Sequence, residues 1–141
     1  MLATVAVGTD GSATAAKAVD AAAEIAERFG SKLVLLSAFE GTDSPTGSGS
    51  GADERQWASN NDARVRELLS RLEQEMRARN IECSSLHDEG DPADVLVRLA
   101  GECNADLLVI GSVGMHRRVL GSVPNTVTHK APCSVYVVKT D

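Results

Sequence analysis

The sequence predicts an α/β protein built on a doubly wound, five-stranded parallel sheet with helices on both faces. Short apolar runs alternate with segments of helical periodicity along the chain. Most of these runs are apolar at consecutive positions, which is typical of strands that are covered on both faces. The 141 residues suffice for one domain, spanning residues 1–141, with a substantial core.

The first part of the chain contains two predicted strands with a helix between them. Residues 2–8 (LATVAVG) and 32–39 (KLVLLSAF) are continuous apolar runs and are expected to be buried strands. The helix should begin after Ser12, a good N-terminal cap, and end before Gly30. Its inward face is expected to carry Ala15, Val19, Ala22, Ala26 and Phe29. Residues 40–53, rich in Gly and Ser, offer little apolar surface and are expected to form a mobile loop.

The rest of the chain continues the alternation of helices and strands. Apolar residues at helical spacing predict a long amphipathic helix, and Pro92 after Asp91 is typical of a helix start. We expect this helix at residues 54–79, an edge strand at 81–87 and the helix from Pro92 at 92–103. A buried strand at 105–111, a short helix at 122–130 and a last strand at 133–139 should follow. The inward stripe of the first of these helices is expected to carry Val65, Leu68, Leu69, Leu72 and Met76.

Composition excludes several classes of protein. Acidic residues outnumber basic ones by 20 to 14, for a net charge of −6, which argues against a general nucleic-acid binder. Cys83, Cys103 and Cys133 are odd in number and widely spaced, so we expect buried free thiols rather than disulfides or a zinc site. No run approaches the roughly 20 apolar residues of a membrane span, and no signal peptide is recognised. We therefore expect a soluble cytoplasmic protein.

The last predicted strand suggests a partner. Residues 133–139 include Val135, Tyr136, Val137 and Val138, which make this strand too apolar for an exposed edge. Because exposed apolar edges tend to pair with another chain, we expect a homodimer through the strand from Cys133 to Lys139.

Two glycine-containing turns indicate where a ligand would bind. In doubly wound sheets, ligands lie beyond the carboxyl ends of the strands, where the strand order reverses. Thr9 and Asp10 follow the first strand; Gly111 ends the fourth, and Gly114 comes after it. If these strands are neighbours, the two turns face one crevice that suits a nucleotide, with Asp10 accepting a ribose hydroxyl and glycine amides meeting phosphates.

The segment after the fourth strand, GSVGMHRRVLGSVPN, offers further phosphate contacts. Gly121 allows a turn, and Ser122 is expected to cap the next helix, whose N-terminus attracts anions. Arg117 and Arg118 add positive charge, and at most one of these neighbours is expected to reach the ligand. The alternative is that the whole segment is a structural turn.

At this point the chain resembles the universal stress protein family. The resemblance rests on VAVGTDGS, GDPADVLVRLA, ADLLVIGSVG and LGSVPNTVTHKAPCSVYVVK, and it covers nearly the whole chain except residues 40–53. It implies an adenine-nucleotide α-hydrolase-like fold with strand order 3-2-1-4-5 and dimers formed through the last strand. It also implies binding of ATP or a related adenine nucleotide, with or without Mg²⁺.

The resemblance also assigns residues to the nucleotide. The family motif G-x2-G-x9-G-[ST] matches Gly111 and Gly114 at its start and Gly121 and Ser122 at its end. By this match Asp10 would contact the ribose, Ala38 and Ile110 would line the adenine, and the phosphates would meet Gly114, Gly121, Ser122 and Val123.

One feature departs from the family motif. Six residues, MHRRVL, lie between the second and third glycines instead of nine. Three fewer residues remove up to about 10 Å of chain. The sequence thus supports contacts to the adenosine part of a nucleotide better than contacts to a triphosphate. AMP and cyclic AMP are therefore possible ligands as well as ATP.

No motif of an efficient catalyst is present. The pattern G-x4-G-K-[ST] is absent and no carboxylate cluster suggests a metal site, so we expect no catalytic residue and no metal ligand. The leading hypothesis is a stress-response sensor or reservoir for an adenine nucleotide. Two alternatives stay open: a dimeric interaction scaffold of the same fold that binds no nucleotide, and a slow ATPase or autophosphorylating protein.

Overall fold

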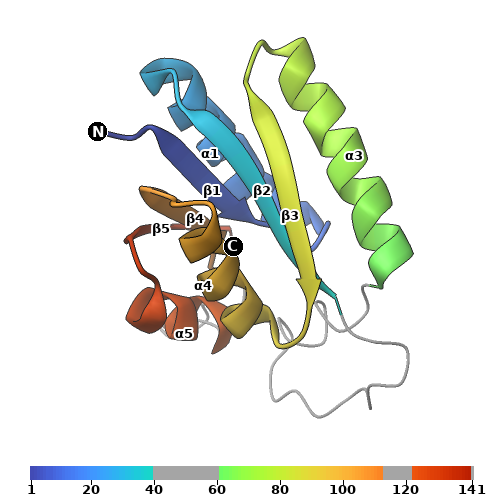
Figure 1. The fold of residues 1–141 in the computed structure, drawn as a ribbon, viewed down its shortest axis with the longest axis vertical. Coiled ribbons are helices and arrows are strands. Elements are labelled where there is room, and N and C mark those ends of the chain that lie inside the picture. Colours follow the sequence, from blue (N-terminus) through green and yellow to red (C-terminus); the bar gives the residue numbers. More distant parts are fainter. Residues whose placement is uncertain (40–60, 113–121, 141) are drawn as a thin grey trace.

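The structure, a computed structural model, describes residues 1–39, 61–112 and 122–140. Its elements, in chain order, are β1 (Thr4–Gly8), α1 (Ala13–Phe29), β2 (Lys32–Phe39), α3 (Asp62–Ala78), β3 (Cys83–Glu89), α4 (Pro92–Glu102), β4 (Leu107–Gly111), α5 (Ser122–Lys130) and β5 (Ser134–Val138) (Figure 1). All strands are parallel, in the order β3-β2-β1-β4-β5. The predicted fold class and strand order are confirmed.

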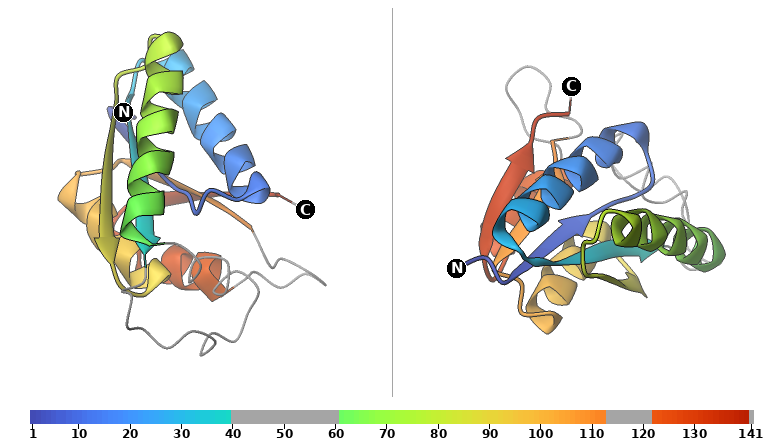
Figure 2. Two further views of the ribbon diagram at one scale, coloured as in Figure 1. Left: turned by 90° about the vertical axis from the view of Figure 1, so that its right-hand side faces the viewer. Right: turned by 90° about the horizontal axis from the view of Figure 1, so that it is seen from above.

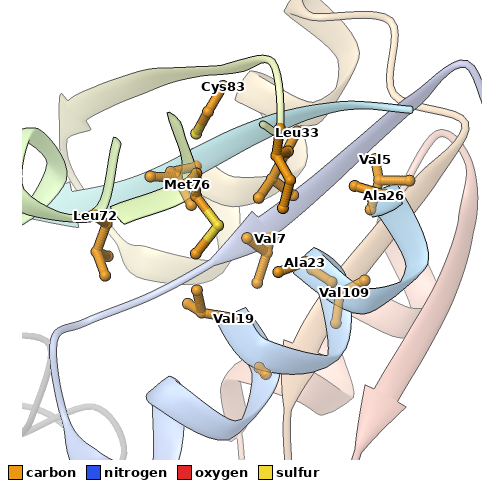
Figure 3. Packing of buried hydrophobic residues seen from close by; sticks show 14 of the residues in the cluster. Val5, Val7, Val19, Ala23, Ala26, Leu33, Leu72, Met76, Cys83 and Val109 are labelled. Atoms are coloured by element: carbon orange, nitrogen blue, oxygen red, sulfur yellow. The ribbon is translucent and has the colours of Figure 1, made fainter. Parts of the chain in front are cut away.

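Helices cover both faces of the sheet and form two cores. On one face, α1 and α3 pack on β1, β2 and β4; on the other, α4 and α5 pack on the same three strands (Figures 1 and 2). Successive residues of a strand point to opposite faces, so Val5 and Val7 belong to the first core and Ala6 to the second. Figure 3 shows the first core, where Val19 of α1 and Met76 of α3 lie near Val7.

The predicted helix ends are confirmed in part, since α3, expected from residue 54, begins at Asp62 after its cap Asn61. The Ser12 hydroxyl accepts a hydrogen bond from the backbone N–H of Ala15 at 3.1 Å, which caps α1. Gly30 closes the same helix in the left-handed conformation, with φ at 66°. Asp91 caps α4, and Pro92 occupies its first turn. α5 begins at Ser122 itself, which places its cap position on residue 121, outside the described residues.

Several predictions about individual residues are wrong. Phe29 is 66% exposed rather than buried, because it is the last residue of α1 and the core face of this helix ends at Ala26. The third strand lies at residues 83–89 and not 81–87, since its polar end pairs with β2, including Phe39 with Glu89. Cys103 and Cys133 are half-buried, and only Cys83 is buried. The predicted loop at residues 40–53 lies outside the described residues.

Candidate functional site

The turn between β1 and α1 holds Thr9 and Asp10 at the carboxyl end of the central strand. Both are nearly inaccessible, at 1% and 5% exposed. The Thr9 hydroxyl accepts a hydrogen bond from the Gly11 N–H at 3.1 Å, and Asp10 Oδ1 accepts one from the Ser12 N–H at 2.9 Å. Gly11 has a φ of 83°, a conformation that favours glycine. These contacts hold the Asp10 carboxylate at the N-terminus of α1.

β2 anchors this turn through two consecutive residues. The Thr9 N–H donates to the Leu36 carbonyl at 2.9 Å. The Ser37 hydroxyl, which is fully buried, donates to the Thr9 carbonyl at 2.7 Å. Sequence reasoning missed Ser37, although a single hydroxyl within the apolar run VLLSAF is a detectable signal, because buried hydroxyls require partners.

The structure brings Ala38, Ile110 and Val123 into one core cluster, on the face covered by α4 and α5. Their exposed fractions are 1%, 3% and 3%. β1 separates the strands of Ala38 and Ile110, and the chain reverses its strand order there. Ala38 and Ile110 are thus buried apolar residues on the two strands that flank β1, and residues of this kind line ligand sites.

α5 directs its N-terminus toward the same edge. Because β4 and β5 are parallel, the helix that connects them must run back from the carboxyl ends of the strands to their amino ends. Its first residues are Ser122 and Val123. The first N–H groups of a helix make no bond within the helix itself and lie at the positive end of its dipole, so a helix N-terminus suits an anion.

Gly111 has a packing role that sequence reasoning missed. A Cβ at this position would lie 3.1 Å from Thr140 Cγ2. The Thr140 N–H donates to the buried Ser112 hydroxyl at 3.0 Å, and the Lys17 ammonium donates to the Thr140 carbonyl at 3.1 Å. The absence of a side chain at Gly111 therefore admits the C-terminal segment against β4.

Four predicted site residues lie outside the described residues. These are Gly114, Arg117, Arg118 and Gly121. The described members of the predicted site are Thr9, Asp10, Ala38, Ile110, Gly111, Ser122 and Val123.

A hollow of about 430 Å³ lies between α1 and α3, on the opposite face from Ala38 and Ile110. Its apolar wall includes Val19, Leu72 and Met76, and its polar end is the Thr9–Ser12 turn. Near its other end, the Arg79 guanidinium joins α3 to Glu27 of α1, with a shortest N···O distance of 2.8 Å. The sequence patterns did not predict this hollow.

The cysteines are poorly suited to redox chemistry. Burial raises the pKa of the Cys83 thiol to about 11, with a further contribution from the nearby Glu73 carboxylate. Burial also raises the pKa of Cys103 and Cys133. Because the thiolate is the reactive form, these thiols react slowly near neutral pH.

A hydrogen bond between Asp62 of α3 and His87 of β3 joins this helix to the sheet. The Asp62 carboxylate lies 3.0 Å from Arg66 Nε and 3.1 Å from His87 Nε2. The Arg66 guanidinium, assisted by His87, holds the pKa of Asp62 below its ordinary value. Within residues 1–39, 61–112 and 122–140, no three His, Cys, Asp or Glu side chains converge as a metal site would require.

Comparison with known proteins identifies the family. The family model described as "Universal stress protein family" matches residues 1–139. This chain belongs to the universal stress protein family. A curated relative, universal stress protein Rv1636 of Mycobacterium tuberculosis (strain ATCC 25618 / H37Rv), is 36% identical over 143 aligned residues, covering 97% of this chain and 96% of the relative.

Solved universal stress proteins share the fold. One that was crystallised in complex with cAMP is 33% identical, has a TM-score of 0.75, and covers 99% of each chain. A universal stress protein family protein from Arabidopsis thaliana, solved with AMP bound, is 22% identical with a TM-score of 0.69, covering 98% of this chain and 92% of its own. The second likeness concerns the fold alone. No helix in the described part of the chain is long and apolar enough to cross a membrane.

Proposed function

We propose that this universal stress protein binds an adenine nucleotide at the carboxyl edge of the sheet, and serves as a sensor or reservoir rather than as a catalyst. The observation that carries the proposal is the meeting of three features at this edge. These are the Asp10 turn, the apolar residues Ala38 and Ile110 on the flanking strands, and the N-terminus of α5. The likeness to the cAMP-bound relative supports the same ligand class.

Each feature suits one part of an adenine nucleotide. The Asp10 carboxylate accepts a hydrogen bond from a ribose hydroxyl, as acidic residues do at other nucleotide sites of doubly wound sheets. Ala38 and Ile110 provide apolar contact for the base. The backbone N–H groups of Ser122 and Val123, with those of Gly114 and Gly121, donate hydrogen bonds to phosphate oxygens. In this proposal, one of the neighbouring arginines at positions 117 and 118 adds positive charge.

The second part of the proposal is a cytoplasmic homodimer formed through β5. Among the described residues this strand pairs with β4 on one side, and it forms an edge of the sheet. Tyr136 is 43% exposed there. An apolar edge of this kind is suited to pairing with a second copy.

The test is calorimetric titration of the full chain with ATP, AMP and cyclic AMP, each with and without Mg²⁺. Mass spectrometry of the purified protein first establishes whether host nucleotide is already bound. We expect dissociation constants of about micromolar or below for at least one nucleotide. Absence of binding by folded, ligand-free protein would overturn the proposal and favour the scaffold alternative. A phosphate mass shift after incubation with ATP would instead indicate autophosphorylation.

A further inference from the structure

We propose that Ser37 is a positioning residue for the nucleotide site and sets the affinity for nucleotide through Asp10. The inference rests on the proposed function above. Ser37 lies in β2, immediately before Ala38, and its side chain is fully buried on the face that packs against α1 and α3. It therefore touches no ligand on the opposite face and acts only through the residue it holds.

The residue that Ser37 holds is the one that precedes Asp10. Two successive peptide groups of the turn are anchored to β2: the Thr9 N–H donates to the Leu36 carbonyl at 2.9 Å, and the Thr9 carbonyl accepts from the Ser37 hydroxyl at 2.7 Å. The second peptide group includes the N–H of Asp10. Because a peptide group is planar and rigid, fixing the Thr9 carbonyl fixes the direction in which the chain enters Asp10.

Only one of these two anchors depends on the residue type in β2. The Leu36 anchor is a backbone carbonyl, which nearly any residue would supply. The Ser37 anchor is a side-chain hydroxyl, and without it the carbonyl of Thr9, a residue only 1% exposed, loses this donor. A buried hydroxyl in a strand core costs stability unless it is bonded, so a serine here is explained by the turn that it holds.

The orientation of Asp10 depends on the bond between Ser37 and the Thr9 carbonyl. Its carboxylate bonds to the Ser12 N–H at 2.9 Å, only two residues further on, so this contact orients the side chain relative to α1. The Ser37 bond orients the same turn relative to β2, the strand that carries Ala38. The Ser37 bond therefore fixes the position of Asp10, the proposed ribose contact, relative to Ala38, the proposed base contact.

The chain offers a matched control in Ser31. This serine, 5% exposed, also donates its hydroxyl to a backbone carbonyl, that of Leu2, and it does so at the opposite, amino end of β1 and β2. Ser37→Ala and Ser31→Ala thus remove the same kind of bond, one at each end of the paired strands β1 and β2. Both should lower the melting temperature by similar amounts, whereas only the first lies at the carboxyl edge.

The experiment titrates wild type, Ser37→Ala, Ser31→Ala, Asp10→Asn and Ser37→Ala/Asp10→Asn with whichever of ATP, AMP or cyclic AMP the wild type binds most tightly. We expect Ser37→Ala to weaken binding about tenfold and Ser31→Ala by less than about twofold. In the Asp10→Asn background, Ser37→Ala should change affinity by less than about twofold. If Ser37 acted independently of Asp10, its loss of affinity would add to the loss that Asp10→Asn causes. If it acts through Asp10, little further affinity is lost once the carboxylate is gone.

The outcomes separate this inference from the proposed function. Unchanged affinity in Ser37→Ala, an equal loss in Ser31→Ala, or additive losses in the double variant would each overturn the positioning role while leaving nucleotide binding in place. A wild-type protein that binds none of the three nucleotides would overturn both. Thermal unfolding of each variant identifies any loss of binding that comes from unfolded protein.

Discussion

Substituting Asp10 with asparagine tests the proposed ribose contact with little change to the fold. Asparagine is nearly isosteric with aspartate and keeps a side-chain carbonyl oxygen, so it can still accept the hydrogen bond from the Ser12 N–H that is now 2.9 Å long. The change removes the negative charge and replaces one acceptor oxygen with a donor. The β1–α1 turn should therefore persist while the proposed acceptor for the ribose hydroxyl is lost.

The expected loss of affinity follows from the chemistry of this acceptor. A hydrogen bond to a charged group contributes about 1.5–3 kcal/mol, and about 1.4 kcal/mol corresponds to tenfold in affinity. Asp10 is only 5% exposed, so solvent screens this bond little. Asp10→Asn should then weaken nucleotide binding by about 10- to 100-fold. Asp10→Ala also loses the Ser12 bond, which should lower stability by about 0.5–1.5 kcal/mol.

The assay is calorimetric titration of both variants, beside urea unfolding to measure stability. Asp20→Asn is the matched control, because it makes the same change in charge on an exposed residue of α1, in the hollow on the face opposite Ala38 and Ile110. Binding by Asp10→Asn within about twofold of wild type would refute the ribose contact. If Asp10→Ala alone weakened binding, the carboxylate would serve the turn rather than the ligand.

Three further predictions concern packing, pH and assembly. Gly111→Val should lower stability by about 1–3 kcal/mol in urea unfolding, because its Cβ would approach the Thr140 methyl, and adding Thr140→Ala should recover part of this loss. Burial raises the pKa of Cys83 from 9.0 to about 11, so the neutral thiol contributes to stability below pH 9, and this contribution is lost between pH 9 and 11. The free energy of unfolding of Cys83→Ala, measured in urea, should therefore decline less than that of wild type over this range. Tyr136→Asp should convert the proposed dimer into a monomer in light scattering, since it places a charge on the β5 edge, and a variant that stays dimeric would place the interface elsewhere.

The sequence predicted the elements best where a single physical requirement determines the residue type. Continuous apolar runs identified β1, β2 and β4 because both faces of these strands are covered. The third strand was placed two residues early, since its polar residues become strand only by pairing with β2, as Glu89 does with Phe39. Periodicity also identified the buried face of α1, but it does not reveal how far that face extends, and Phe29 is consequently exposed.

The candidate site could be proposed from the sequence only in part. The position of Asp10 after a strand and before a helix could be interpreted without a structure, and the family resemblance assigned Ala38 and Ile110. The partners of Thr9 could not be predicted in this way. Ser37 is 28 positions away, and only the alignment of β2 beside β1 brings its hydroxyl to the Thr9 carbonyl.

Two described glycines near the site, Gly111 of the motif and Gly8 of β1, have a packing explanation beside the nucleotide one. At Gly111 a side chain would meet Thr140, and at Gly8 a Cβ would lie 3.0 Å from Leu96 of α4. Both glycines thus avoid a close contact with a side chain of the same chain, whether or not a ligand binds. Asp10 differs, because it contributes a polar carboxylate, held by the Ser12 N–H at the end of the central strand, rather than a space that a side chain would fill. The case for an adenine nucleotide therefore depends on the Asp10 carboxylate and the apolar pair beside it, and its decisive test is the removal of that charge.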